Sequence, residues 1–271
     1  MRIFLLPIST RRTLIYCQRL NVTTTSQQSW LDKGTIKAAK IWAGWEKKES
    51  GWKKKVVDCG NIALKRIPFE EWGLKSIPPL SARLEAEELS GKGNVEVHFP
   101  SKLLPEQTIL GVLRKLGTER QSLHRKNMIW SFVAMPISAP IALIPIIPNL
   151  PFFYLVFRAW SHWRALSGSK HIEFLLKNHL ITPRPSKVLD ELYSTGKEPF
   201  DVGSDLEGAE TLVLHRSNGT RIAEALEMPE LDLELDRAVW QVEKALRSEK
   251  ELQEERKESD KANSAPGQKK H

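Results

Sequence analysis

Cysteine is scarce in this chain of 271 residues: only Cys17 and Cys59 occur, and neither has a second cysteine nearby to form a CxxC pair. Zinc ribbons and disulfide scaffolds need clusters of cysteines at fixed spacing, so the sequence excludes both. The two thiols indicate a reduced compartment or no special role for cysteine.

Motifs of catalysis and metal binding are also missing. The chain has no GxSxG, no HExxH and no glycine-rich loop followed by Lys-Ser/Thr. Ser161 and His162 are adjacent, which does not make a nucleophile and base, and His171 and His179 flank Glu173 without a recognised metal spacing. We therefore predict no enzyme, no cofactor and no catalytic or metal site.

Charge is absent from the thirty residues Met128–Phe157, which contain no Asp, Glu, Lys, Arg or His. A hydrocarbon core of about 30 Å takes roughly 20 apolar residues as one helix, so the length permits insertion into a membrane. Five prolines interrupt the middle of the stretch and make one unbroken helix unfavourable. The pattern predicts two helices, near 118–135 and 151–166, joined by a bent segment.

The flanks of this stretch are basic, which favours a hairpin or re-entrant loop that keeps both flanks on one side of the membrane. A single pass and a buried hairpin in a soluble helical domain are the alternatives. The residues predicted to mark the membrane-inserted segment are Met128, Pro136, Pro140, Pro145, Pro148, Pro151 and Phe157. The residues predicted to anchor it at the interface are Trp42, Trp45, Trp52, Arg158, Trp160, His162, Trp163 and Arg164.

The basic excess lies before the apolar stretch: residues 1–127 carry 23 basic and 12 acidic side chains, and residues 158–271 carry 18 and 21. Within residues 29–64, tryptophans and lysines interleave at helical spacing, as in helices that lie at a lipid interface. An amphipathic helix packed on its own domain explains the same pattern. Nucleic acid is a less favoured partner, because no RNA- or DNA-binding motif accompanies the lysines.

The first thirty residues are rich in Arg, Ser and Thr and have no acid before Asp32, as in a mitochondrial presequence. Two β-prone runs, 3–8 and 13–17, give a second reading, a β-hairpin of the folded domain. Residues 94–99 alternate apolar and polar side chains and predict a strand that could pair with this hairpin.

The composition divides the chain into three regions: a basic region 1–117 with the hairpin and the Trp/Lys helices, the membrane hairpin with its aromatic flank over 118–185, and an acidic region 186–271. In the last region, residues 224–256 predict a helix, and the charged run that follows predicts a disordered tail. The expected fold is mainly α and membrane-associated, with a proline-broken apolar helical hairpin, a small N-terminal β component and this disordered tail.

Three segments resemble the fungal mitochondrial potassium/proton exchange-related family: the opening RIFLLPISTRRTLIYCQ, the Trp/Lys-rich segment, and above all IPNLPFFYLVFRAWSHWRALSGSKHIEFLL at residues 147–176. The resemblance covers roughly residues 1–185. Because it includes the first residues, it favours the hairpin over a cleaved presequence.

The resemblance implies a protein of the mitochondrial inner membrane linked to potassium/proton exchange, with inner-membrane lipids and leucine-zipper EF-hand transmembrane proteins as partners. It supplies no ion-binding or catalytic residues. An exchanger normally holds a titratable group at membrane depth, and the nearest candidates, His124, His162, His171 and Glu173, lie outside the uncharged stretch. We therefore expect an accessory subunit; the alternative is a peripheral or anchored protein that contacts ribosomes or anionic lipid.

Overall fold

The computed structural model of this chain forms two compact units. The first comprises Met1–Leu5 and Ile15–Ser186, and the second comprises Leu6–Leu14 and Lys187–His271. The residues described are 1–18, 30–47, 50–90, 94–140, 149–194 and 210–264.

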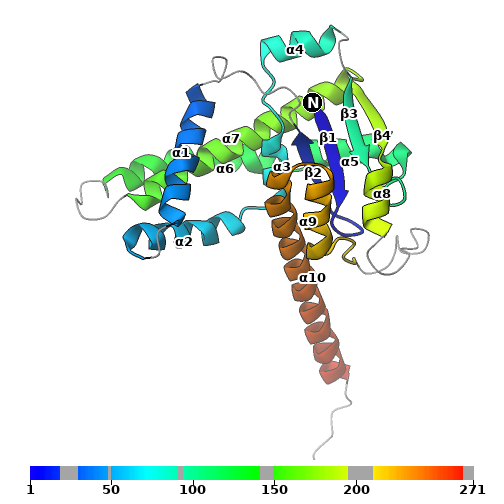
Figure 1. Ribbon diagram of the computed structural model, residues 1–271. Helices are drawn as coiled ribbons and strands as arrows, with labels where there is room; N and C mark the ends of the chain where they lie inside the picture. Colours follow the sequence, from blue (N-terminus) through cyan, green and yellow to red (C-terminus); the bar gives the residue numbers. More distant parts are fainter. Residues whose placement is uncertain (19–29, 48–49, 91–93, 141–148, 195–209, 265–271) are drawn as a thin grey trace, which may run out of the picture. The chain divides into compact units, whose positions relative to one another are not determined.

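A four-stranded sheet, in the order β2-β1-β3-β4, lies toward one end of α7 (Figure 1). β1 (Arg2–Pro7) and β2 (Thr13–Gln18) are neighbours joined by five residues, and β3 (Val95–Phe99) pairs with β1 in parallel. The predicted N-terminal hairpin and its pairing with the strand at 94–99 are therefore confirmed. Residues 19–29, the end of the presequence-like stretch, lie outside the described residues.

The fourth strand, β4 (Ile181–Pro185), is not among the elements predicted from the sequence, and it contains Pro183 and Pro185. β4 pairs with β3 in parallel, with Pro183 opposite Val97. Proline lacks the N–H that a central strand would need, and β4 is an edge strand, the position where proline is tolerated.

Helices pack around the sheet and along one another (Figure 1). α7 is the longest helix of this unit and packs against α3, α5 and α6. The helices of this unit are α1 (Trp30–Glu46), α2 (Trp52–Lys65), α3 (Phe69–Ser76), α4 (Ala82–Leu89), the short 3-10 helix η2 (Glu106–Thr108), α5 (Ile109–Thr118), α6 (Gln121–Ser138) and α7 (Leu150–Lys177).

The hydrophobic core joins one face of the sheet to α5 and the second half of α7. Alternate side chains of β1 and β3 contribute to it, as the two-residue period of a strand requires. Its fully buried members include Ile3, Leu5, Val97, Phe99, Ile109, Leu113, Ile172 and Leu175.

The predicted membrane-associated fold with an inserted apolar hairpin is wrong. α6 and α7 do lie side by side on either side of the proline-rich segment. However, none of the helices in the described ranges combines the length and the apolar character that crossing a bilayer requires. Polar side chains interrupt both helices, namely Ser131 and Ser138 in α6 and Arg158, Ser161 and His162 in α7.

The prolines of this region take different positions. Pro136 lies inside α6, which continues to Ser138, and Pro151 lies in the first turn of α7, where its missing N–H is not needed. Pro140 follows α6 and is exposed. Pro145 and Pro148 lie outside the described residues.

The second unit contains α8 (Lys187–Ser194), α9 (Arg216–Ala225) and α10 (Pro229–Ser264), together with the hairpin tip of β1 and β2. Leu231, Leu235, Ala238, Val239 and Val242 form the buried face of α10, which lies within the helical region predicted at 224–256. The helix continues to Ser264, through much of the charged run expected to be disordered, since Glu, Lys, Arg and Ala all favour helix. Residues 265–271 are not among those described.

Gly168 of α7 allows a close approach to the end of α3. A Cβ at this position would lie 2.1 Å from the backbone carbonyl oxygen of Leu74 at the end of α3. We expect Gly168→Ala to lower the free energy of unfolding by about 1–3 kcal/mol, because the backbone must move to admit the methyl group. Urea unfolding of the purified protein measures the change.

Gly111→Ala is the matched control, because it lies in α5 with open space around its Cβ position. This substitution should leave stability unchanged or raise it by up to about 1 kcal/mol, the difference in helix propensity between the two residues. Equal effects of the two substitutions would contradict the close approach of α3 and α7.

Candidate functional site

A cluster of buried polar side chains lies where α3, α6 and α7 meet in the first unit. Among the described residues, α3 contributes its only carboxylate. The helix begins after Pro68, and its first turn carries Glu70 and Glu71, where negative charge is stabilised by the helix dipole. Glu70 is half-buried and accepts a hydrogen bond of 2.8 Å from Arg120. Glu71 points inward and is 1% exposed.

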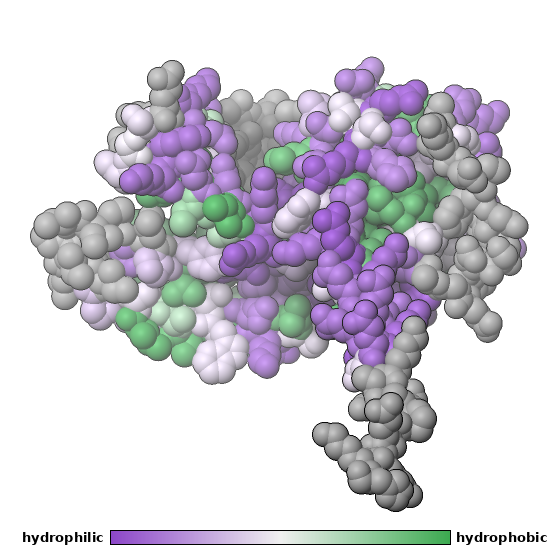
Figure 2. Space-filling view, turned by 90° about the horizontal axis from the view of Figure 1, so that it is seen from below, coloured by the Kyte–Doolittle hydropathy of each residue, from purple (hydrophilic) through white to green (hydrophobic). Residues whose placement is uncertain are grey.

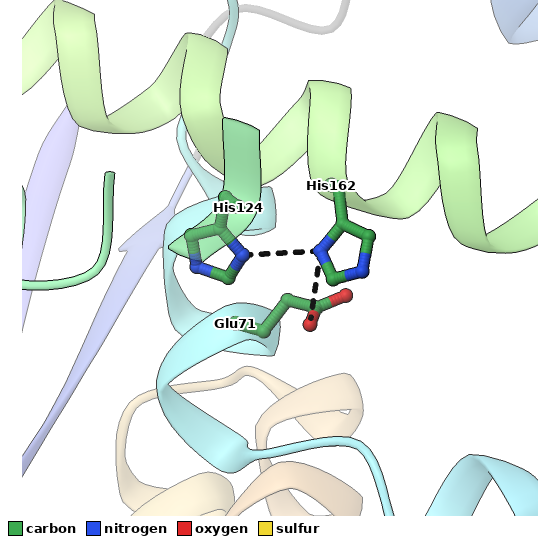
Figure 3. Close-up of side chains that lie close together, drawn as sticks. All are labelled: Glu71, His124 and His162. Atoms are coloured by element: carbon green, nitrogen blue, oxygen red, sulfur yellow. Dashed lines mark hydrogen bonds and ion pairs between the residues drawn. The ribbon is translucent and has the colours of Figure 1, made fainter. Parts of the chain in front are cut away.

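α7 and α6 supply the other members of the cluster. Arg158, Ser161 and His162 are spaced by three and four residues, so they share one face of α7. His124 lies on the facing side of α6 and is 2% exposed. Figure 3 shows that His124, His162 and Glu71 converge from α6, α7 and α3.

Glu71 forms a bidentate ion pair with Arg158. The guanidinium Nη1 donates to Oε1 at 2.9 Å, and Nη2 donates to Oε2 at 3.2 Å. The Ser161 hydroxyl donates to Oε1 at 2.6 Å. Burial alone raises the pKa of Glu71, but the Ser161 hydrogen bond and the charge of Arg158 more than offset it, so the pKa lies below its ordinary value and the group is a carboxylate.

The same arginine determines which nitrogens of the two histidines carry protons. Arg158 Nη2 lies 2.8 Å from His162 Nε2, and because a guanidinium can only donate, Nε2 accepts and Nδ1 carries the hydrogen. His162 Nδ1 lies 3.1 Å from His124 Nδ1, which must then accept and leave its own proton on Nε2. That buried Nε2 has no hydrogen-bond partner among the described residues.

Both histidines are neutral at physiological pH. Burial lowers the pKa of His162 to about 4, with the attraction of Glu71 outweighed by burial together with the repulsion of Arg158, His124 and Lys75. Burial also lowers the pKa of His124, and the charges of Arg120 and Arg158 act in the same direction. The hydrogen-bond pattern agrees, since a second proton on either ring would place two donors face to face.

Lys75 brings a second cation to the edge of the cluster. Its ammonium donates to the Ser161 oxygen at 3.0 Å and lies 3.1 Å from the ring centroid of Trp72. The side chain is buried, and the aromatic face replaces part of the lost hydration of the charge. The cluster therefore holds two positive charges and one negative charge.

The donor set alone could suit a metal ion, because the ligand atoms of Glu71, His124 and His162 all lie within 4.8 Å of one another. Two imidazoles and one carboxylate are ligands that Zn²⁺ accepts. However, Arg158 already binds both Glu71 oxygens and the far nitrogen of His162, and a divalent ion would add charge beside two buried cations. The four side chains are therefore better described as an ion pair between Glu71 and Arg158, with two neutral imidazoles hydrogen-bonded beside it, than as a metal centre.

The predicted interface anchors are divided between this cluster and the surface. Arg158 and His162 lie in the cluster, and Arg164 donates to the Lys75 carbonyl oxygen at 3.1 Å. Trp160 is half-buried, with its ring 6.0 Å from that of Phe157, and Trp163 is exposed. Whether any of them contacts lipid stays a prediction.

The other predicted anchors lie on α1 and α2. Trp42 is half-buried with its ring against Gly60, and Trp45 meets Trp52 edge to face with ring centroids 5.6 Å apart. The indole of Trp52 is 55% exposed. In the predicted membrane segment, Met128 and Phe157 are half-buried, and Pro136 and Pro151 are exposed.

The titratable residues singled out from the sequence separate into three places. His124 and His162 meet in the cluster, whereas Glu173 accepts a hydrogen bond from Gln121 at the surface. His171 is fully buried, with Nε2 3.0 Å from Glu88 and Nδ1 2.8 Å from the Pro78 carbonyl oxygen.

Sequence reasoning does not identify Glu71, because it places no helix within residues 67–80. The available signal was Pro68 followed by two acids, a combination typical of a helix start. It could have placed a helix there. It could not have paired Glu71 with Arg158, 87 positions later.

The comparisons with known proteins give one family and two relatives. A family model described as mitochondrial K⁺–H⁺ exchange-related matches residues 2–176, a range that contains the whole cluster. The uncharacterized protein YDL183C of Saccharomyces cerevisiae is 26% identical over 272 residues, covering 90% of this chain and 85% of that protein. The uncharacterized protein C23H3.12c of Schizosaccharomyces pombe is 32% identical over 191 residues, covering 70% and 82% respectively. No solved structure matches significantly.

The lowered pKa values predict that acid destabilises the fold. Between pH 6.5 and about 4, an unfolded chain binds a proton at position 162 that the folded chain excludes, so stability falls as the pH decreases through this range. His162 alone should remove roughly 3 kcal/mol, and His124 and Glu71 add in the same direction. Urea unfolding at pH 7, 6, 5 and 4 measures the profile.

His162→Gln tests the origin of this profile, since Gln can still accept from Arg158 but does not titrate. It should flatten the profile relative to the unchanged protein. His179→Asn, at an exposed position with φ of 54° that Asn tolerates, is the control and should keep the original slope. An unchanged slope in His162→Gln would show that this histidine is not held neutral.

Proposed function

The chain belongs to the family of mitochondrial K⁺–H⁺ exchange-related proteins, and we propose that within it this protein is a non-enzymatic accessory that supports the exchange rather than the exchanger itself. The proposal rests on one observation: the buried carboxylates among the described residues already form hydrogen bonds and ion pairs with side chains of the same chain.

Potassium–proton exchange needs a group that alternately holds a proton and a cation. The two buried glutamates among the described residues are Glu71 and Glu88. Arg158 and Ser161 hold both oxygens of the first, and His171 lies 3.0 Å from both oxygens of the second. Releasing either carboxylate to a potassium ion would leave a buried cation or imidazole without its partner, which costs several kcal/mol.

The cluster instead suits a structural role in an assembly. It joins three helices through charge and hydrogen bonds that are directional, so it fixes the relative rotation of α3, α6 and α7 more strictly than apolar packing does. In our proposal these helices form a rigid body that a membrane-embedded exchange protein binds. The partners we propose are the leucine-zipper EF-hand transmembrane proteins, and the place is the mitochondrial inner membrane.

The proposal predicts a difference between whole mitochondria and the isolated protein. Mitochondria that lack this protein should swell more slowly in potassium acetate, a measure of potassium–proton exchange, and the full chain should restore the rate. The purified chain in proteoliposomes should give no potassium-driven proton flux, because Glu71 and Glu88, the buried carboxylates among the described residues, already have partners. Robust flux from the chain alone would overturn the accessory role.

Two variants connect this activity to the cluster. Glu71→Gln removes the charge that Arg158 and the buried helices require, so it should fail to restore swelling at equal protein abundance. Glu106→Gln changes an exposed glutamate of η2 and should restore swelling fully. Full rescue by Glu71→Gln would show that the cluster does not matter for the exchange.

A further inference from the structure

In α6 the fully buried positions are polar and many large apolar side chains are exposed. His124, Ser131 and Ser138, spaced by seven residues, are its buried positions. The large apolar side chains of its second half face outward instead. A water-soluble helix normally buries the apolar face, so this arrangement requires an explanation.

Large apolar side chains gather on the outer side of both helices. Figure 2 shows hydrophobic side chains on the surface at the left of the view, the direction in which α6 and α7 extend in Figure 1. We name the following set the outer apolar face, with exposed fractions from 41% to 76%: Ile129, Trp130, Phe132, Val133 and Ile137 of α6, and Phe153, Tyr154 and Val156 of α7.

The fully buried positions of α7 nearest this zone are also small or polar. They are Ala159, Ser161 and His162, with Asn149 just before the helix. Small side chains let the two helices approach closely, and the apolar bulk is left on the outside. The arrangement leaves a contiguous exposed apolar surface, which marks an interaction site.

Two contacts between the helices locate the outer apolar face along them. His124 meets His162 at one level, and the Asn149 side chain donates to the Ser138 carbonyl oxygen at 2.8 Å at the other. All members of the outer apolar face lie between these two levels. The face is therefore a continuous zone on two adjacent helices and not a scatter of single side chains, which would need no explanation.

The charged side chains of the two helices beside this zone have one sign. Residues 120–172 contain no Asp or Glu, whereas Arg125 and Lys126 are exposed one turn before the apolar side chains of α6. Trp163, which is 37% exposed, lies on α7 near the same level. Cationic and aromatic side chains at the border of an apolar face are typical of surfaces that meet anionic lipid headgroups.

We propose that the outer apolar face is a docking surface for the headgroup region of an anionic bilayer, bound peripherally from one side. On each helix the apolar positions spread over roughly half the circumference at about 100° per residue, a convex surface that suits a fluid better than a shaped protein groove. A second copy is a poorer occupant, since both faces would carry the same uncompensated basic border. The cellular membrane follows from the proposed function, but the binding itself does not depend on it.

Flotation of the purified full chain with vesicles tests the proposal. The chain should float with vesicles of phosphatidylcholine and cardiolipin, and more weakly with phosphatidylcholine alone. Trp130→Ser/Ile137→Ser removes the two most exposed members of the face on α6 and should weaken binding at least tenfold. Arg125→Gln/Lys126→Gln should weaken binding to the cardiolipin vesicles and reduce its dependence on salt.

Leu233→Ser/Leu252→Ser is the matched control, because it removes two large apolar side chains of similar exposure from α10. All positions changed are exposed, so circular dichroism and thermal unfolding should match the unchanged protein. Absence of flotation, or equal binding by the Trp130→Ser/Ile137→Ser variant, would overturn the proposal. A dimer in sedimentation that this variant abolishes would assign the face to a second copy instead. None of these results depends on the exchange assay, so the two proposals can fail separately.

Discussion

The bidentate pair between Glu71 and Arg158 is the interaction on which the first unit's polar interior depends. It places a carboxylate that is 1% exposed against a guanidinium from a helix 87 positions later. A buried charge without its partner is strongly destabilising, so each residue requires the other. The arginine also donates to His162, and that contact fixes the protons on both histidines. One side chain thus determines the charge, the tautomers and the helix contacts of the cluster.

This closed arrangement explains why membership in an exchange-related family is compatible with an accessory role. The buried acids of the described residues have their hydrogen bonds within the chain, and the histidines are neutral, so in our proposal the cluster provides rigidity and not an ion path. The same helix pair carries its apolar side chains outward. The fully buried positions of α6 and of the first half of α7 are small or polar. The bulky apolar side chains therefore lie on the outer apolar face.

The sequence predicts the helices and strands better than it predicts what their side chains contact. Periodicity and β-propensity locate the N-terminal hairpin, the strand at 94–99 and the helices on both sides of the prolines. The uncharged run 128–157 misleads, because the absence of charge indicates lipid only where a helix is also long and apolar enough to cross a bilayer. α6 instead buries Ser131 and Ser138. Glu71 could not be assigned to the site because its partner is distant in sequence, and β4 could not be predicted because its prolines are compatible only with an edge strand.

The most direct test of the account is the coupling energy between Glu71 and Arg158 in a double-mutant cycle. Glu71→Gln, Arg158→Met and the double variant would be compared by urea unfolding at pH 7. If the pair is buried and mutually required, each single change should cost about 3–5 kcal/mol and the double change clearly less than their sum, with a coupling of at least about 2 kcal/mol. Additive effects, with a coupling below about 0.5 kcal/mol, would contradict the contact on which the cluster is built.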